Sequence, residues 1–468
     1  MYQLFIDRCD DLRFLEERYR ERRPQFIIVY GRRRIGKTEL LLRFSKDKPH
    51  IYFLCEKTST RANIVKLSGR MAEYLRKKSF SRILFEDWED LFKEFVEWKV
   101  KDEKTIIILD EFQYLIELDK GVLSLFQKIW DLHLSRREDI MLILCGSSVG
   151  MMETEVLGYR SPLYGRRTGQ WRVDELELRY IKEFVPSYDY RNLIYVYGVF
   201  GGVPAYLSKI DPSISFIENL KRLFLRRGEF LYEEADNLLR QELREPRNYK
   251  LILRALSEGY RRVIEISNIT GLDKSAVSRY LGTLELLDLV SYEIPVLERP
   301  KTRKRLYYIK DNYFNFWFRF IDVNRDLIEE GRGEVVLDEI VRNLDNYIGF
   351  IYEKISKKFI QFYPYIPFKI ARLGREWGKS SRGESYEIDL LGYDKNKSKY
   401  LILEVKWSDL NNRDIKRIMK KLEKIVEMIG IEGQIYYGVI ARKIFDIKEY
   451  ENNLILLDLD DLMKYILR

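Results

Sequence analysis

The sequence predicts an α/β protein of several domains, and three observations lead to this prediction. The chain has 468 residues, which suggests three or four domains of about 100–200 residues each. Its first third alternates apolar runs of strand length with segments of helical periodicity, a pattern typical of a parallel sheet covered by helices on both faces. Mixed strand and helix patterns return after a long helical stretch, so we expect a second α/β domain near the end of the chain.

Four apolar runs account for the strands expected in the first sheet. These strands are expected at residues 26–30, 51–55, 105–109 and 141–145. The domains expected from the changes in pattern are an α/β core at 1–175, a helical lid at 176–245, a helix-turn-helix segment with a hairpin at 246–320, a helical connector at 321–345 and a second α/β domain at 346–468.

Composition and charge exclude only a few classes of function. The net charge of +9 fits an acidic partner such as nucleic acid, but 83 basic and 74 acidic residues describe a mixed solvated surface. The three cysteines, Cys9, Cys55 and Cys145, are far apart, so neither a disulfide framework nor a cysteine zinc site is expected. The sequence has no signal segment and no apolar run of membrane-spanning length, so we expect a cytoplasmic chain without a membrane partner.

A glycine-rich loop follows the first expected strand and opens a helix. Its eight residues are Gly31, Arg32, Arg33, Arg34, Ile35, Gly36, Lys37 and Thr38. The pattern G-x-x-x-x-G-K-T between a strand and a helix is that of a phosphate-binding P-loop. The glycines let successive backbone N–H groups face a phosphate, Lys37 is expected to reach the β- and γ-phosphates, and the Thr38 hydroxyl is expected to bind Mg²⁺. ATP and Mg²⁺ are therefore the predicted cofactors.

Polar residues follow two other expected strands. Asp110 and Glu111 come directly after the run 106–109. Asp110 is expected to hold the Mg²⁺ shell, and Glu111 is placed to orient or deprotonate the attacking water. Ser147 follows the run 141–145 and is the better candidate to bridge this water and the γ-phosphate, the alternative being a turn cap. Together these residues predict ATP hydrolysis.

Several segments carry a resemblance to a known family. The opening Phe5-Ile6-Asp7-Arg8, the loop at 31–38 and the run Leu109-Asp110-Glu111-Phe112-Gln113 resemble the archaeal P-loop ATPase family, which is similar to the AAA+ and signal-transduction (STAND) ATPases. Residues 161–169 and 201–207 carry the same resemblance.

The resemblance implies roles for further residues. It implies that Arg166 or Arg167 senses the γ-phosphate, because a guanidinium offers bidentate donors to phosphoryl oxygens. The pair can act in cis or across a subunit interface, so a nucleotide-dependent homo-oligomer is among the expected assemblies. The resemblance also implies that Arg8 and the turn at Pro204 flank the nucleotide.

Residues 249–309 have the pattern of a winged helix-turn-helix. Asp273 caps a helix at 274–284 whose outer face carries Ser275, Ser278 and Arg279. A hairpin follows, with strands at 289–292 and 306–309 around a basic tip. DNA contacts are expected from the helix face and from the tip. The alternative is a domain that packs against the nucleotide domain or binds protein. The residues expected to contact DNA are Ser275, Ser278, Arg279, Arg303 and Arg305.

Four charged residues near the end of the chain suggest nuclease chemistry. Glu353 lies in an expected helix, Asp389 in an expected strand, and Glu404 and Lys406 on one face of the next strand. Asp389 and Glu404 would hold Mg²⁺ on a scissile phosphate, and Lys406 would position or activate water. This set resembles the restriction-endonuclease-like, or PD-(D/E)xK, fold over residues 346–468. The alternative is a strand that simply alternates Glu and Lys, and cleavage is a separate question from the fold.

The leading hypothesis is an ATP-driven enzyme that binds DNA and carries nuclease-like machinery. Its competitor is a STAND-type switch whose C-terminal domains bind protein or DNA without cleaving it. A third hypothesis is an ATPase in which the nuclease-like fold serves only as a scaffold.

Overall fold

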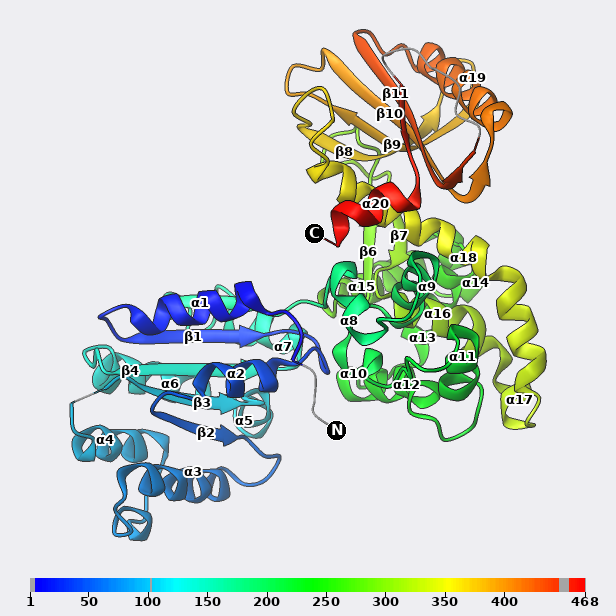
Figure 1. Cartoon of the computed structure of the whole chain (residues 1–468). Helices are drawn as coiled ribbons and strands as arrows, with labels where there is room; N and C mark the ends of the chain where they lie inside the picture. The colour runs from blue at the N-terminus through cyan, green and yellow to red at the C-terminus, as the bar shows by residue number, and fades with distance from the viewer. Residues whose placement is uncertain (1–4, 102, 446–453, 468) are drawn as a thin grey trace. The chain divides into compact units, whose positions relative to one another are not determined.

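The computed structural model describes residues 5–101, 103–445 and 454–467 (Figure 1). Contacts group the chain into two compact units. The first contains the residues up to Leu176 together with 203–205, and the second contains 177–202 and the residues from Tyr206 onward. None of the helices in the described ranges is long and apolar enough to cross a membrane.

The first unit is built on a five-stranded parallel sheet. Its strands are β1 (Gln25–Tyr30), β2 (His50–Leu54), β3 (Thr105–Asp110), β4 (Ile140–Gly146) and β5 (Gly169–Arg172). The strand order is β2-β3-β4-β1-β5 and every pairing is parallel. The carboxyl ends of β1, β4 and β3 therefore lie side by side at one edge. The four expected strands are confirmed, whereas β5 was not predicted because its four partly exposed residues form no apolar run.

Helices cover both faces of this sheet (Figure 1). They are α1 (Cys9–Arg20), α2 (Lys37–Ser45), α3 (Thr60–Leu75), α4 (Trp88–Trp98), α5 (Gln113–Leu118), α6 (Val122–Ile129) and α7 (Val149–Met151), with the short turns η1 (Phe80–Arg82), η2 (Trp130–Leu134) and η3 (Met152–Val156). Side chains alternate along each strand, so Ile27 and Val29 pack with α1 and α2, while Phe26 and Ile28 pack with α3, α4 and α6. Both faces are apolar, as expected of a buried parallel sheet.

The second unit begins with helices that lead into a winged helix. The helices before it are α8 (Leu178–Phe184), α9 (Tyr190–Phe200), α11 (Phe216–Phe224) and α12 (Phe230–Glu242), and the four-residue α10 (Pro204–Leu207) lies where the chain passes between the two units. The winged helix consists of α13 (Arg247–Ser257), α14 (Val263–Thr270), α15 (Lys274–Leu286) and the antiparallel strands β6 (Val290–Glu293) and β7 (Leu306–Ile309). The expected three helices and hairpin are confirmed.

A 30-residue helix, α18 (Gly333–Phe362), follows. The elements between the wing and this helix are α16 (Asn312–Phe316), η4 (Trp317–Ile321), η5 (Asp322–Asn324) and α17 (Arg325–Glu329). Buried residues recur every three or four positions from Val336 through Leu344 to Ile355, and no proline interrupts them. Of the connector expected at 321–345, residues 333–345 are therefore continuous with the helix that carries Glu353, whereas the part before them is divided among the end of η4, η5 and α17.

The C-terminal sheet has five strands. They are β8 (Arg372–Lys379), β9 (Ser385–Tyr393), β10 (Lys399–Leu410), β11 (Gln434–Ile444) and β12 (Leu454–Leu457), with helices α19 (Asn412–Ile429) and α20 (Leu459–Ile466). The order is β12-β11-β10-β9-β8, antiparallel from β8 to β10 and parallel from β10 to β12. With α18 before it and α19 between β10 and β11, this sheet has the restriction-endonuclease-like arrangement. Strand β8 was not predicted because two glycines and four charged residues break its apolar pattern.

The chain that leaves β6 packs along β8, the edge strand of this sheet. The Val296 N–H donates to the Arg375 carbonyl at 3.0 Å, and the Leu297 N–H donates to Glu376 Oε2 at 2.9 Å. Val296 is buried in the core of the C-terminal domain. The segment thus covers a strand edge that would otherwise leave backbone groups unpaired, and it ties the winged helix to the C-terminal sheet.

Replacing Glu376 tests this connection. Glu376→Ala should lower the free energy of unfolding of the second unit by about 1–3 kcal/mol, because the buried Leu297 amide would lose its acceptor. Urea denaturation measures this change, and hydrogen–deuterium exchange should become faster at residues 295–298. Lys379→Ala, at the exposed end of the same strand, is the control. Equal exchange rates at residues 295–298 in the two variants would show that the Glu376 contact does not hold this segment on β8.

Candidate functional site

The P-loop lies between β1 and α2, at the carboxyl edge of the first sheet. Gly31 follows β1 closely beside the backbone of Val173, where a Cβ atom would lie 2.3 Å from the carbonyl oxygen. Gly36 precedes α2 with a φ of +90°, a conformation that favours glycine. The Lys37 ammonium is buried and donates to the carbonyl oxygens of Gly31 at 2.9 Å and Arg32 at 2.7 Å. Burial lowers the pKa of Lys37. The loop thus has the curled backbone and internal lysine of a phosphate-binding loop.

Asp110 is fully buried at the end of β3, and three donors meet its carboxylate. The Thr38 hydroxyl donates to Oδ2 at 2.7 Å, the Tyr52 hydroxyl donates to Oδ2 at 2.9 Å, and the Glu111 N–H donates to Oδ1 at 2.9 Å. Burial and the charge of Asp110 raise the pKa of Tyr52, which keeps the phenol protonated as a donor. The hydroxyl of Thr38 and the carboxylate of Asp110 are adjacent oxygen ligands of the kind that Mg²⁺ prefers, so the pair fits this ion.

Glu111 follows Asp110 with a left-handed backbone (φ 56°) and is held by polar neighbours. The Ser147 hydroxyl donates to Glu111 Oε2 at 2.6 Å. The Gln113 amide also donates to Glu111 and lies 3.0 Å from the Ser147 hydroxyl, while its oxygen accepts from the Ser147 N–H. Ser147 thus reaches Glu111 directly. Gln113 had no role in the sequence prediction, and its place two residues after Glu111 was the available signal.

Arg8 lies next to the P-loop. Its buried guanidinium donates to the carbonyl oxygens of Ile35 at 2.6 Å and Asp174 at 2.7 Å. Arg8 therefore joins the start of the chain to the loop and to the end of β5. Pro204 begins α10, and its predicted place beside the nucleotide remains a prediction.

The backbone of Arg166 and Arg167 lies near the amino end of β1, while the charge of the Arg167 guanidinium acts on Tyr30, the residue before Gly31, and opposes the rise in the pKa of that phenol. The Thr168 N–H donates to the carbonyl of Phe26, five residues before Gly31, which is about 16 Å along a strand. Arg166 pairs with Asp131 at 3.3 Å, and the Arg167 guanidinium lies 5.3 Å from the Tyr164 ring centroid. The γ-phosphate role of this pair, in cis or across a subunit interface, remains a prediction.

The residues expected to contact DNA lie on α15 and on the loop of the wing. Ser275 donates to the helix cap Asp273 at 2.6 Å, and Ser278 donates to the Lys274 carbonyl at 2.9 Å, so both hydroxyls already have local partners. Arg279 is exposed and stacks beside Tyr280. In the wing, Arg303 is exposed, whereas the Arg305 guanidinium lies 4.2 Å from the Tyr292 ring centroid. Four of the five residues are therefore exposed, and Arg305 is half-buried.

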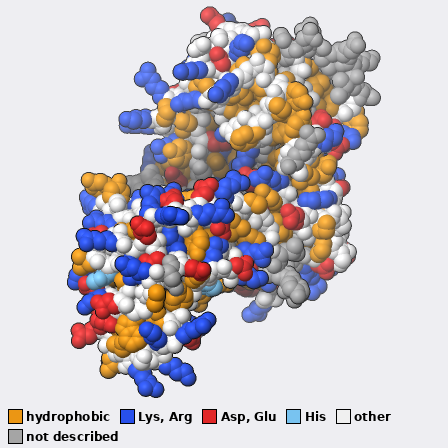
Figure 2. Space-filling view, turned by 60° about the vertical axis from the view of Figure 1, so that its left-hand side comes forward, with side chains coloured by type: hydrophobic (Ala, Val, Ile, Leu, Met, Phe, Trp, Pro, Cys, Tyr) orange, Lys and Arg blue, Asp and Glu red, His pale blue; other side chains and the backbone are white. Residues whose placement is uncertain are grey.

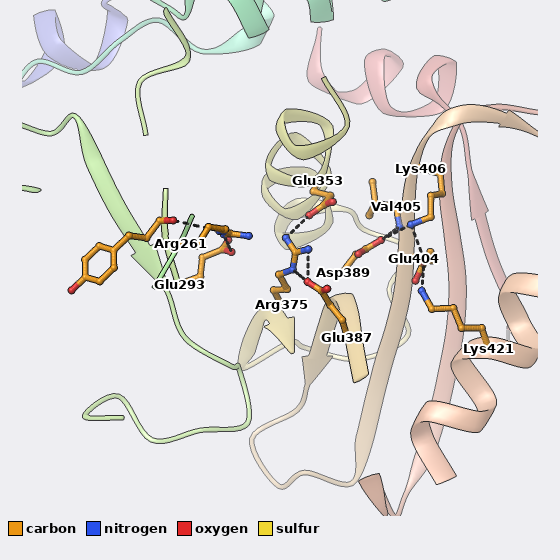
Figure 3. A network of polar contacts seen from close by, with 11 residues as sticks. Arg261, Glu293, Glu353, Arg375, Glu387, Asp389, Glu404, Val405, Lys406 and Lys421 are labelled. Atoms are coloured by element: carbon orange, nitrogen blue, oxygen red, sulfur yellow. Dashed lines mark hydrogen bonds and ion pairs between the residues drawn. The ribbon is translucent and has the colours of Figure 1, made fainter. Parts of the chain in front are cut away.

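Asp389, Glu404 and Lys406 meet in the C-terminal domain, as Figure 3 shows. Lys406 Nζ lies 3.3 Å from Asp389 Oδ2 and 2.7 Å from Glu404 Oε1. The Val405 N–H donates to Asp389 Oδ2 at 2.8 Å. Glu404 is almost fully buried, and its Oε2 has no hydrogen-bond partner among the described residues. The expected convergence of these three side chains is therefore observed.

Two basic residues that the sequence prediction did not include also reach these acids. Lys421 of α19 lies 2.6 Å from Glu404 Oε1, and Arg375 of β8 lies 3.1 Å from Glu353 Oε2 and also pairs with Glu387 (Figure 3). In the parts of the chain that the structure describes, no three His, Cys, Asp or Glu side chains are grouped closely enough to hold a metal ion. Glu353 therefore does not form a three-carboxylate cluster with Asp389 and Glu404.

Two acids of this site, Glu353 and Asp389, have raised pKa values. Burial, followed by repulsion from Asp389, raises the pKa of Glu353 to about 8, although Arg375 opposes the shift. Burial and the charge of Glu404 raise the pKa of Asp389. For Lys406, burial lowers the pKa, but Asp389 and Glu404 outweigh this effect and raise it. The perturbed carboxyl groups around one lysine are typical of a functional site.

The order of the first sheet, the P-loop and the buried acid of β3 define the class of protein, which is a P-loop ATPase core. A family described as an ATPase domain predominantly from Archaea matches residues 5–210. The arsR family of bacterial regulatory proteins matches residues 250–292. A family of archaeal and bacterial proteins of unknown function matches residues 317–418.

Proteins of similar sequence and structure identify the family of the chain. An uncharacterised protein of Methanocaldococcus jannaschii is 37% identical over 465 residues, which cover 98% of this chain and 100% of that protein. An uncharacterised ATP-binding protein of the same organism is 44% identical over 45 residues, 10% of this chain and 76% of that protein. The Walker-type ATPase of Pyrococcus abyssi shares the fold, with a TM-score of 0.52 and 21% identity over 67% of this chain and 96% of that one. The chain therefore belongs to the archaeal P-loop ATPase family and binds nucleotide.

The raised pKa of Glu353 predicts a pH dependence of stability. The folded protein holds this proton up to about pH 8, whereas an ordinary glutamate has a pKa of 4.5. The contribution of Glu353 to the free energy of unfolding should therefore be fully present below about pH 4.5 and decline as the pH rises to about 8. Glu353→Gln should make this decline smaller, which urea denaturation at several pH values measures. Glu423→Gln, at an exposed position of α19, should keep the wild-type profile. A decline of the same size in Glu353→Gln would refute the prediction.

Proposed function

We propose that this protein is an Mg²⁺-dependent ATPase that couples its nucleotide state to the winged helix and to the nuclease-like domain, and that it acts on DNA. The observation that carries the proposal is the convergence of Asp389, Glu404 and Lys406 in a chain that also contains a complete P-loop site. Nucleotide binding and family membership support the ATPase part. The action on DNA rests on the helix-turn-helix and on the C-terminal site.

In the ATPase site, each residue has a defined task. Lys37 and the loop N–H groups bind the phosphates, and Thr38 and Asp110 hold Mg²⁺, which neutralises charge on the β- and γ-phosphates when it is bound. Glu111 takes a proton from the attacking water or orients it. Ser147 and Gln113 keep the Glu111 carboxylate in place through their hydrogen bonds.

Of the pair Arg166 and Arg167, Arg166 acts on a second copy of the chain. The backbone of the pair lies near the amino end of β1 and Arg166 points to Asp131, which favours action of Arg166 across a subunit interface. A guanidinium that reaches a neighbour's γ-phosphate would stabilise the charge that builds up during phosphoryl transfer. A nucleotide-dependent homo-oligomer follows from this role.

The winged helix and the C-terminal site bind the nucleic acid. Ser275, Ser278 and Arg279 on α15 contact the DNA groove or its backbone, and Arg303 and Arg305 contact phosphates. Asp389 and Glu404 would hold Mg²⁺, which would neutralise charge on the scissile phosphate, and the buried Glu404 Oε2 has no hydrogen-bond partner among the described residues. Lys406 positions the water that attacks the scissile phosphate.

A second candidate function is a STAND-type switch whose C-terminal domains bind protein or DNA without cleavage. The observation that favours it is that basic side chains already neutralise the acids of the C-terminal site. Lys406 and Lys421 share Glu404 Oε1, and Arg375 pairs with Glu353. Nucleotide-dependent oligomerisation without salt-dependent DNA affinity would favour this function.

Glu111→Gln tests the ATPase mechanism. The substitution should lower kcat for ATP hydrolysis by about 10²–10⁴-fold, because it removes the general base, while ATP binding is retained. Ser147→Ala should have a smaller effect, since Gln113 still holds Glu111. Phosphate release and the binding of a fluorescent ATP analogue measure the two quantities. Ser135→Ala is the control, since its hydroxyl donates only to a nearby helical carbonyl. Wild-type hydrolysis by Glu111→Gln would exclude Glu111 as the base.

Digestion of linear, circular and single-stranded DNA with Mg²⁺ and ATP tests the nuclease role. Glu404→Ala should abolish cleavage and leave ATP hydrolysis measurable, because the two sites use different residues. Glu384→Ala, an exposed acid of the same domain, should cut like the wild type. Identical products from the wild type and Glu404→Ala would rule out the nuclease assignment, and unchanged cleavage by Lys37→Ala would rule out coupling to ATP.

A further inference from the structure

Helix α19 carries a stripe of basic residues on its solvent side. The stripe consists of Arg413, Arg417, Lys420, Lys421 and Lys424, all exposed. Their spacing of i, i+4, i+7, i+8 and i+11 places them on one face of the helix. The opposite face is apolar and packs into the core of the C-terminal domain through residues such as Ile415, Leu422 and Ile425. The helix therefore presents positive charge outward from Arg413 to Lys424.

The stripe reaches the nuclease-like site through one of its own members. Lys421 Nζ lies 2.6 Å from Glu404 Oε1, the oxygen that Lys406 also contacts (Figure 3). A ligand that follows the stripe would therefore arrive at Asp389, Glu404 and Lys406 without crossing another element of the domain.

Most of the positive charge in the stripe is not neutralised by acids. Arg417 pairs with Asp414 at 3.3 Å, but its side chain remains 80% exposed. Within the described residues, Arg413, Lys420 and Lys424 make no ion pair. The acids Glu423 and Glu427 lie towards Tyr437 of β11, where burial and their charges raise the pKa of that phenol. These two acids stand three residues after Lys420 and Lys424, so they border the stripe, and acidic and basic side chains are also mixed on the face in Figure 2.

The dimensions of the stripe match a nucleic-acid strand. Eleven residues separate Arg413 from Lys424, which corresponds to about 16 Å along a helix. In duplex DNA the phosphates of one strand recur about every 3.4 Å along the duplex axis, so the length of the stripe covers several of them. Lysine and arginine at helical intervals suit contacts to backbone phosphates, which carry no sequence information.

We propose that the α19 stripe binds the phosphodiester backbone of DNA and guides the strand to the site formed by Asp389, Glu404 and Lys406. This inference rests on the proposed function and adds the surface that binds the substrate. Arg413, Arg417, Lys420 and Lys424 hold successive phosphates. Lys421 is the residue of the stripe that contacts the site, through Glu404.

The test compares two variants of the full chain that lose equal charge. One carries Arg413→Ala, Arg417→Ala, Lys420→Ala and Lys424→Ala. The control carries Arg61→Ala, Lys66→Ala, Arg70→Ala and Lys78→Ala, which removes two arginines and two lysines from exposed positions in and just after α3. Each set includes one arginine that pairs with an acid three residues away, Arg417 with Asp414 and Arg70 with Glu73.

Binding of a labelled DNA duplex is measured by fluorescence anisotropy over a salt series, with a chelator present so that Mg²⁺-dependent cleavage cannot occur. The stripe variant should bind DNA at least about tenfold more weakly at low salt. The magnitude of the slope of log K against log salt should also fall by about 2–4, because each lost phosphate contact lowers that magnitude by about 0.9. The control should keep the wild-type slope. A conservative variant, Arg413→Lys with Arg417→Lys, should bind like the wild type, because a point charge satisfies a phosphate.

The outcomes separate this inference from the proposed function. An unchanged slope in the stripe variant overturns the stripe, even if the wild type cleaves DNA. Stripe-dependent binding by a protein that never cleaves DNA supports the stripe and refutes the nuclease role. No salt-dependent binding of DNA by the wild type overturns both, and binding only to an acidic protein also overturns the stripe.

Discussion

The buried carboxylate of Asp110 is the constraint on which the nucleotide site depends. A buried carboxylate is costly unless donors surround it, and its donors come from three segments: the start of α2, strand β2 and the turn after β3. Satisfying this group fixes the P-loop helix relative to the acidic turn. The same turn places Glu111 where Ser147, at the end of β4, can hold it. The parallel order of β1, β4 and β3 makes this meeting possible, because it brings the three strand ends to one edge.

The second unit depends on a different constraint, the edge of its C-terminal sheet. Strand β8 has only one neighbouring strand, and the chain that leaves β6 covers its free side with Val296 and Leu297. A segment of the winged helix is therefore also part of the C-terminal core. Helix α18 extends the connection, since its 30 residues run without interruption from the connector to Glu353. The helix-turn-helix and the nuclease-like site are thus joined by packing and not by a linker alone.

Opposite charges make the acidic site of the second unit stable. Glu353, Asp389 and Glu404 are largely buried, the pKa values of Glu353 and Asp389 are raised, and each of the three acids lies near a basic side chain. Arg375, Lys406 and Lys421 reach them from β8, β10 and α19. Removing one partner of such a group leaves an uncompensated buried charge, which destabilises a protein more than the pair stabilises it. The basic residues therefore contribute to the architecture of the domain in addition to any role in binding phosphate.

The sequence by itself determined the features that neighbouring residues encode. These are the P-loop, the acid and serine at the ends of two buried strands, the helix-turn-helix, and the common face of Glu404 and Lys406, because local periodicity and strand ends are visible in the order of residues. Strands β5 and β8 could not be predicted, since their residues form no apolar run. Only the tertiary structure decided that Lys421 meets Glu404, that Val296 packs on β8, and that Arg166 pairs with Asp131. Each of these depends on how distant segments pack, and side-chain patterns along one segment do not record its neighbours in space.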